Sequence, residues 1–259
     1  MIVPDFKEKR NTASYSSISE PFGITSLDKK LNGSIKRGGL YLISGETGAG
    51  KTTLGIHSAI ASAQQGEKCA IIVTAENAEE YVKNAKTFPG FAKYYDSGMI
   101  LIEELSGNFW DLKFELYRNL NSKSLDAYLT SIEASIKQLL ATGIKRLIID
   151  SLTPLLPGND KMGDMIHRVV DALAAPGVLT IAISEAAEGE LSRYGIEEYY
   201  ASGIIKLGVV GNEGKYAAKI VKMPGEYDSS PFYYVITSNG LEPITENERA
   251  ILIKFKRGA

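Results

Sequence analysis

The sequence is poor in the residues that form disulfides and zinc sites. Among its 259 residues there are one cysteine, Cys69, and two histidines, His57 and His167. A single cysteine excludes an intramolecular disulfide framework and is typical of a reducing compartment. Because the chain has no Cys/His spacing suited to zinc, we interpret both histidines as packing or surface residues. Cys69 opens an apolar run and is expected to be an inert core residue.

The chain also lacks a strong charge of one sign and a long apolar run. Its formal net charge is −2, so no overall positive field would attract nucleic acid. No apolar run is long enough to span a membrane. The N-terminus lacks the basic flank and apolar core of a signal peptide. These absences favour a soluble, cytoplasmic protein without membrane contact.

What the sequence does contain is a regular alternation of short apolar runs and helical segments. We expect strands at 39–44, 69–74, 99–105, 146–150 and 178–184, with helices at 52–65 and 125–142. Such an order is typical of a mostly parallel sheet covered on both faces. Alternating strands at 204–210, 216–223 and 231–238 indicate an antiparallel meander added to the sheet edge. The predicted fold class is therefore α/β with three layers.

The predicted organisation is one core domain with two short extensions. Residues 1–20 are polar and serine-rich and are expected to form an N-terminal arm; 21–245 form the core, and 246–259 a C-terminal tail. The polar segment 106–123 fits no element well, and we expect its Trp110 and Phe114 to cover the core rather than to stack on a base.

One motif carries definite chemistry. The segment GETGAGKT at 45–52 matches G-x-x-x-x-G-K-[ST] between a predicted strand and a predicted helix. Its glycines allow a nest of backbone N–H groups, and the following helix adds its positive end. Lys51 would bring a charge to the β and γ phosphates, and the Thr52 hydroxyl would face Mg²⁺. The alternative is a chance glycine-rich turn. The predicted nucleotide-binding residues are Gly45, Glu46, Thr47, Gly48, Ala49, Gly50, Lys51, Thr52 and Thr53.

Two acids follow predicted strands. Asp150 ends the strand at 146–150, at the edge where such sheets bind ligands, and we expect it to hold Mg²⁺ through water. The alternative is an ordinary aspartate that caps the next turn. Glu76 follows the strand at 69–74 and is predicted to orient the water that attacks the γ-phosphate. The alternative is that Glu76 only stabilises the N-terminus of a helix that starts near Ala78.

The order and spacing of these blocks resemble the KaiC-like branch of the RecA/RadA superfamily of ATPases. The matching blocks are 23–38, 44–53, 74–80, 148–153, 193–207 and 219–227. The resemblance implies a RecA-type core, ATP and Mg²⁺ as cofactors, and a homo-oligomeric ring or filament with ATP between subunits. It places the family's catalytic glutamate at Glu76 and its Walker B aspartate at Asp150. It also implies that Lys222 reaches the γ-phosphate of the neighbouring subunit.

The sequence departs from the family pattern at two places. The family typically has paired glutamates where this chain has Glu76 and Asn77, so one carboxylate must act alone. The family's Lys-x-Arg-Gly pattern becomes KMPG, with Pro224 in place of the arginine. Because an arginine finger can supply several powers of ten in rate, its loss predicts slow turnover or turnover that awaits a partner. Arg193 could substitute for it, or could be an ordinary solvated charge.

Three interpretations remain open at this stage. The first is a Mg²⁺-dependent ATPase, with Glu76, Lys51 and Lys222 as its catalytic residues. The second is a nucleotide-binding assembly switch or scaffold with little hydrolysis. The third is an accessory factor in DNA repair, as for recombinase paralogs. DNA binding ranks low, because the candidate loop at 185–200 holds five glutamates and one arginine. The basic segment at 254–259 could be a solubilising tail or a nucleic-acid contact.

Overall fold

The computed structural model describes residues 20–105, 109–118, 121–156, 163–186, 189–210 and 215–244. The tail predicted at 246–259 and nearly all of the arm predicted at 1–20 lie outside these residues. No helix in the described part of the chain is long and apolar enough to cross a membrane.

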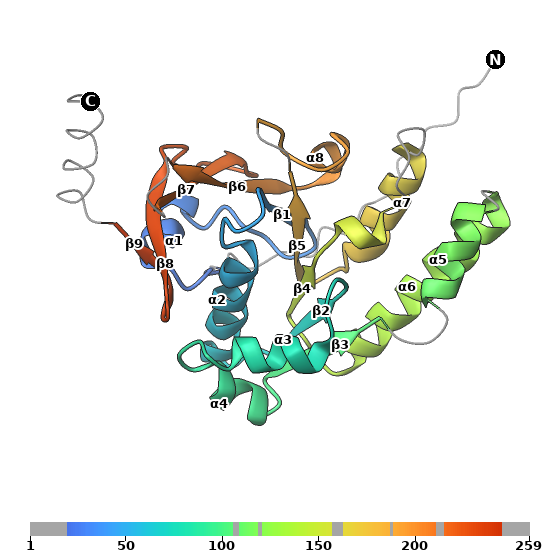
Figure 1. Cartoon of the computed structure of the whole chain (residues 1–259), viewed down its shortest axis with the longest axis horizontal. Coiled ribbons are helices and arrows are strands. Elements are labelled where there is room, and N and C mark those ends of the chain that lie inside the picture. The colour runs from blue at the N-terminus through green and yellow to red at the C-terminus, as the bar shows by residue number, and fades with distance from the viewer. Residues whose placement is uncertain are drawn as a thin grey trace, which may run out of the picture.

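A nine-stranded sheet runs through the centre of the molecule in the order β3-β2-β4-β5-β1-β6-β7-β8-β9 (Figure 1). The pairings from β3 to β6 are parallel, and those from β6 to β9 are antiparallel. The predicted parallel sheet with an antiparallel meander at its edge is thus confirmed. The strands are β1 (Leu40–Gly45), β2 (Cys69–Val73), β3 (Ile100–Glu104), β4 (Arg146–Asp150), β5 (Leu179–Glu185), β6 (Gly203–Val210), β7 (Lys215–Lys222), β8 (Phe232–Thr237) and β9 (Gly240–Pro243).

Helices cover both faces of the parallel part of the sheet (Figure 1). They are α1 (Thr25–Leu31), α2 (Lys51–Gln64), α3 (Ala78–Ala85), α4 (Phe91–Asp96), α5 (Phe109–Arg118), α6 (Ser122–Ala141), the 3₁₀ turn η1 (Thr153–Leu155), α7 (Gly163–Leu173) and α8 (Glu197–Tyr200). The apolar side of α6 is buried from Leu125 to Leu139. The helix starts at a capping box, in which Asn121 and Ser124 bond reciprocally.

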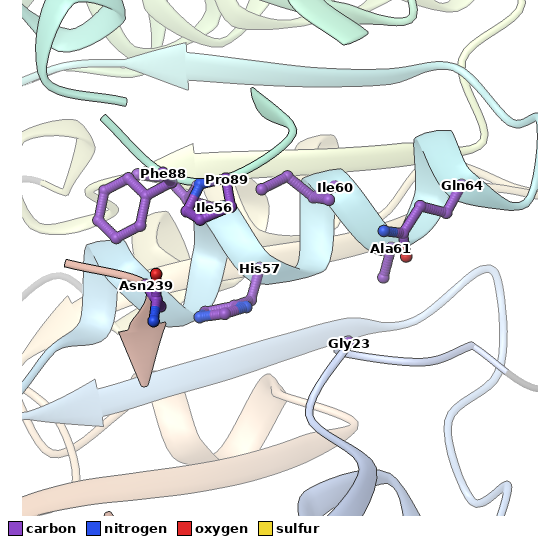
Figure 2. A pocket seen from close by; sticks show the side chains of 9 residues that line it. All are labelled: Gly23, Ile56, His57, Ile60, Ala61, Gln64, Phe88, Pro89 and Asn239. Atoms are coloured by element: carbon purple, nitrogen blue, oxygen red, sulfur yellow. The ribbon is translucent and has the colours of Figure 1, made fainter. Parts of the chain in front are cut away.

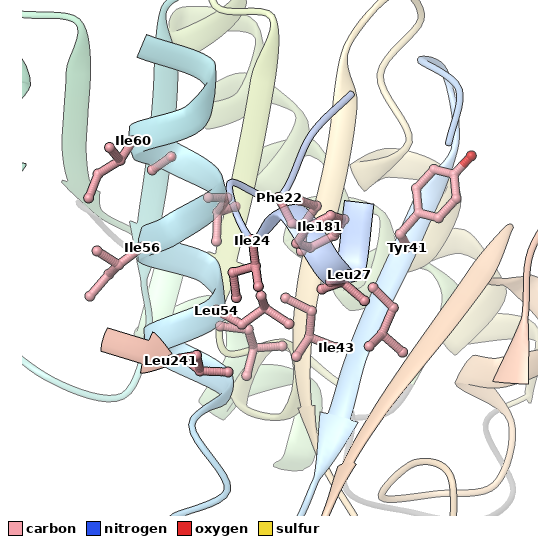
Figure 3. Packing of buried hydrophobic residues seen from close by; sticks show 14 of the residues in the cluster. Phe22, Ile24, Leu27, Tyr41, Ile43, Leu54, Ile56, Ile60, Ile181 and Leu241 are labelled. Carbon is pink, nitrogen blue, oxygen red and sulfur yellow. The ribbon is translucent and has the colours of Figure 1, made fainter. Parts of the chain in front are cut away.

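Within the residues that the structure describes, the core consists of two hydrophobic clusters, one on each face of the sheet. Successive side chains of a strand point to opposite faces. In β1, Ile43 therefore joins the cluster under α1 and α2, and Leu42 joins the cluster under α6 and α7. Figure 3 shows Ile43 beside Leu54 of α2 in the first cluster. Burial on both faces explains why the parallel strands are nearly continuous apolar runs.

The segment at 106–123 differs from the expectation. It contains α5, and the prediction that Trp110 and Phe114 cover the core was wrong, because they are 46% and 63% exposed. The two residues lie one turn apart, whereas Leu112 and Leu116 turn toward the core. Cationic side chains lie over both exposed rings, with Lys113 Nζ 5.5 Å from the Trp110 ring centre.

A buried ion pair lies at the end of the sheet opposite the predicted phosphate site. Arg146 opens β4, and its guanidinium lies 2.9 Å from a carboxylate oxygen of Glu20, with both side chains 1% exposed. Arg37 also donates to Glu20. Glu20, which we had assigned to the N-terminal arm, is therefore part of the packed core. This ion pair connects the first described residue, Glu20, to the first residue of β4, Arg146.

Candidate functional site

The glycine-rich segment forms the connection between β1 and α2. Gly45 ends β1, and Gly50 immediately precedes α2 with a φ of 87°, a left-handed conformation that glycine adopts without strain. Because α2 starts at Lys51, its unpaired N–H groups open onto the loop. The loop thus lies between a strand and a helix, which is the context that the motif required.

The Lys51 ammonium lies among oxygen atoms. Its Nζ donates to the carbonyl oxygen of Glu46, at 2.8 Å. Burial lowers the pKa of Lys51, and the negative charges of Glu185, Asp150 and Glu46 oppose that shift. The side chain is therefore a partly buried cation set between acids, which suits it to bind an anionic group.

A cavity of about 390 Å³ opens beside this segment and contains most of the predicted site. The predicted residues that line it come from the loop, from the start of α2, and from the ends of β2 and β4. They are Thr47, Gly48, Gly50, Lys51, Thr52, Thr53, Glu76 and Asp150. Of the other predicted residues, Gly45 packs against the backbone of Leu207, and Glu46 and Ala49 shape the loop through their carbonyl oxygens.

Asp150 is held at the floor of this cavity. Its Oδ2 accepts a hydrogen bond from the buried Tyr81 hydroxyl, at 3.3 Å. Burial raises the pKa of Asp150, while hydrogen bonds from Thr52 and Tyr81 and the charge of Lys51 lower it. The Asp150–Ser151 peptide is cis, and Ser151 donates its N–H to Thr74 Oγ1 at 2.8 Å. The carboxylate is thus oriented by Thr52 of α2 and Tyr81 of α3, and the next residue is held by Thr74, which follows β2.

Glu76 lies on the open side of the same cavity. It follows β2, and its side chain is exposed. Asn77, rather than Glu76, caps α3, since its side chain accepts the Glu79 N–H at 2.7 Å. Partial burial raises the pKa of Glu76, and the neighbouring charges of Asp150 and Glu80 raise it further. Glu76 therefore faces the cavity and does not cap α3.

Lys222 lies apart from the predicted site residues that line the cavity. It ends β7, and its Nζ donates to the carbonyl oxygens of Glu198 at 3.0 Å and Tyr199 at 3.4 Å. It is absent from the described lining of the cavity. Arg193, the possible substitute for the missing arginine, is exposed in the loop before α8. Within one chain, the site therefore lacks a contribution from β7.

Three of the residues at the site that are absent from the predicted set bear most directly on its geometry. Glu185 ends β5 and lines the cavity, and it could have been found by the same signal as Asp150, an acid that closes an apolar run. Tyr81 reaches Asp150 from α3, and Ile236 lines the cavity from β8. No local pattern distinguishes these two, because only long-range packing brings them to the loop.

An open α/β sheet with a glycine-rich loop after its first strand and acids at neighbouring strand ends is typical of nucleotide-binding proteins. The model of the KaiC ATPase family matches residues 21–248. The chain therefore belongs to the KaiC ATPase family, and the family resemblance noted in its sequence is confirmed.

Relatives of two sizes match the chain. The circadian clock protein KaiC2 of Synechocystis sp. is 26% identical over 91% of this chain, which spans 42% of that protein. The UPF0273 protein MK0039 of Methanopyrus kandleri is 26% identical over 85% of this chain and 89% of its own length. The crystal structure of the KaiC-like protein PH0186 from Pyrococcus horikoshii matches with a TM-score of 0.65 and 26% identity, over 89% of this chain and all of that one.

Proposed function

We propose that the chain is a Mg²⁺-dependent ATPase of slow turnover, with its nucleotide at an interface between copies of the chain. The observation that carries this proposal is the convergence of Lys51, Thr52, Glu76 and Asp150 on one cavity. Membership of the KaiC ATPase family supports ATP as the nucleotide.

The donor set at the cavity suits Mg²⁺. Thr52 offers a hydroxyl and Asp150 a carboxylate, and Mg²⁺ prefers such hard oxygen ligands while keeping several waters. When bound, the ion would neutralise charge on the β and γ phosphates. Tyr81 would keep the carboxylate turned toward the cavity through its 3.3 Å hydrogen bond.

Different residues of the chain would bind the phosphates, accept the proton and act on a neighbouring copy. The N–H groups of the loop and the Lys51 ammonium bind and orient the phosphates. Glu76 accepts a proton from the attacking water at a carboxylate oxygen, and its raised pKa makes it a stronger base than a glutamate of ordinary pKa. Lys222 would act on the nucleotide of a neighbouring copy, after leaving its carbonyl partners on α8.

ATP turnover per chain, measured over a wide range of protein concentration with Mg²⁺ present, tests this proposal. We expect the rate per chain to rise with concentration, because the site is completed by a second copy. Glu76→Gln should lower the rate by about 10²-fold or more while ATP binding persists. The matched control is Glu79→Gln, which removes an exposed acid from the first turn of α3 and should leave the rate unchanged.

A second candidate function is an ATP-binding assembly switch that hardly hydrolyses ATP. Two observations favour it: Pro224 stands where the family has an arginine, and the Lys222 ammonium is bonded to the carbonyl oxygens of α8. ATP binding with a flat, background rate that Glu76→Gln does not change would support the switch and contradict the ATPase.

A further inference from the structure

The hairpin formed by β8 and β9 lies against the first half of α2. Ile236 pairs with Leu241 in its register. The Leu241 N–H donates to His57 Nε2 on α2, at 3.0 Å. Figure 3 places Leu241 beside α2 in the core, and Figure 2 shows His57 next to Asn239 at the hairpin turn. The hairpin is thus attached to the helix that follows the phosphate loop.

The same hairpin also contacts the phosphate loop itself. The Tyr234 hydroxyl on β8 donates to the carbonyl oxygen of Ala49, at 2.6 Å, and both residues are fully buried. One residue further along the loop, a side chain on Gly50 would place its Cβ 3.0 Å from Ile236 Cδ1. Two successive loop residues, Ala49 and Gly50, therefore contact side chains of β8.

The hydrogen bond to the Ala49 carbonyl oxygen also fixes the orientation of the Ala49–Gly50 peptide. A trans peptide unit is planar, so the C=O of Ala49 and the N–H of Gly50 point in opposite directions. When Tyr234 holds the carbonyl oxygen, the Gly50 N–H must point away from β8. Gly50 has a positive φ and no side chain, so its own conformational preferences do little to restrain this peptide.

We propose that Tyr234 is a positioning residue for the nucleotide: its hydroxyl orients the Ala49–Gly50 peptide so that the loop is preorganised for phosphate. This proposal rests on the proposed function, because it concerns the same nucleotide site. Preorganisation strengthens binding, since a ligand no longer has to order the group that receives it.

The surroundings of Tyr234 indicate that the hydroxyl, rather than the ring, serves this purpose. Its ring stacks with those of Tyr216 and Phe232, at centroid distances of 5.5 and 5.7 Å. Phenylalanine would fill the same space without a buried hydroxyl, which is costly unless it is bonded. Burial raises the pKa of Tyr234, so the hydroxyl stays protonated and remains a donor.

Tyr234→Phe tests the proposal, with Tyr216→Phe as the matched control because it removes a hydroxyl from the neighbouring stacked ring. The probe is a fluorescent ATP analogue in stopped flow, with Mg²⁺ present. We expect Tyr234→Phe to bind it about two- to tenfold more weakly, mainly through faster dissociation. Hydrogen–deuterium exchange of the nucleotide-free chain should quicken at 45–50 in this variant alone.

The outcomes separate the two proposals. If the wild-type chain binds the analogue and Tyr234→Phe binds it equally well, the positioning role is wrong and the proposed function stands. If the wild-type chain binds no nucleotide, the proposed function fails and this proposal fails with it. If Tyr234→Phe lowers the thermal midpoint but leaves affinity and loop exchange unchanged, the hydroxyl is merely structural and the proposal is overturned.

Discussion

Breaking the buried pair between Glu20 and Arg146 should destabilise the fold far more than breaking a surface pair. The two side chains are 2.9 Å apart and 1% exposed. The same guanidinium donates to the carbonyl oxygens of Pro21 and Ser58, at 2.8 and 2.6 Å. Arg146 therefore joins the entering chain, the start of β4 and the middle of α2.

The expected magnitude follows from the burial of the pair. Glu20→Gln leaves the charge of Arg146 inside the core without its anion, and removal of one partner of a buried pair costs about 3–5 kcal/mol. Because the glutamine amide oxygen can still accept a hydrogen bond, we expect the lower end, about 3 kcal/mol. In a domain of this size, that loss lowers the thermal midpoint by roughly 6–12 °C.

Urea unfolding followed by circular dichroism measures the effect. The control is Glu133→Gln, which breaks an exposed pair with Lys137 at 3.7 Å and should cost less than about 0.5 kcal/mol. Adding Arg146→Met to Glu20→Gln should restore part of the stability, because no unpaired charge then remains at this position. A Glu20→Gln variant within about 0.5 kcal/mol of the wild type would refute the reasoning.

Two further predictions concern the His57 bond and the missing arginine. Burial lowers the pKa of His57 below its usual 6.5, so the unfolded chain binds more protons and stability should fall as the pH drops below about 6.5. The thermal midpoint should therefore decrease toward about pH 5, and less steeply in His57→Gln; equal slopes in the two proteins would contradict this. Pro224→Arg should raise ATP turnover by about tenfold or more, whereas Pro224→Ala should not. Equal rates in the two variants would show that the missing arginine does not limit turnover.

The sequence was sufficient for the parallel strands and for the phosphate loop, because both have strong local signals. An apolar run such as 146–150 predicts a buried strand wherever it packs, and the spacing of glycines, lysine and threonine in the loop leaves few alternatives. The common position of the acids at 76 and 150 beside one cavity could also be predicted from the chain alone, because the ends of parallel strands meet at one edge of the sheet.

The sequence was insufficient where packing between distant segments decides which side chains are buried and which residues they contact. Arg146 looks like an ordinary charged residue at the start of a strand, and its partner Glu20 lies 126 residues away. Trp110 and Phe114 are large and apolar, which favours burial, yet α5 turns Leu116 inward in their place. The short strand β9 follows a tight turn and has only four residues, too few for a periodic pattern.

The central place of β1 in the sheet has a consequence for the newly made chain. This strand is the first in the sequence, but Leu40 pairs with Thr180 of β5 and Tyr41 with Gly203 of β6. A ribosome adds about 5–20 residues per second, so β1 remains without a sheet partner for roughly 7–28 seconds. Such distant parallel pairings also form slowly. Of the described strands, the one that carries the glycine-rich loop therefore waits longest for its sheet partners during synthesis.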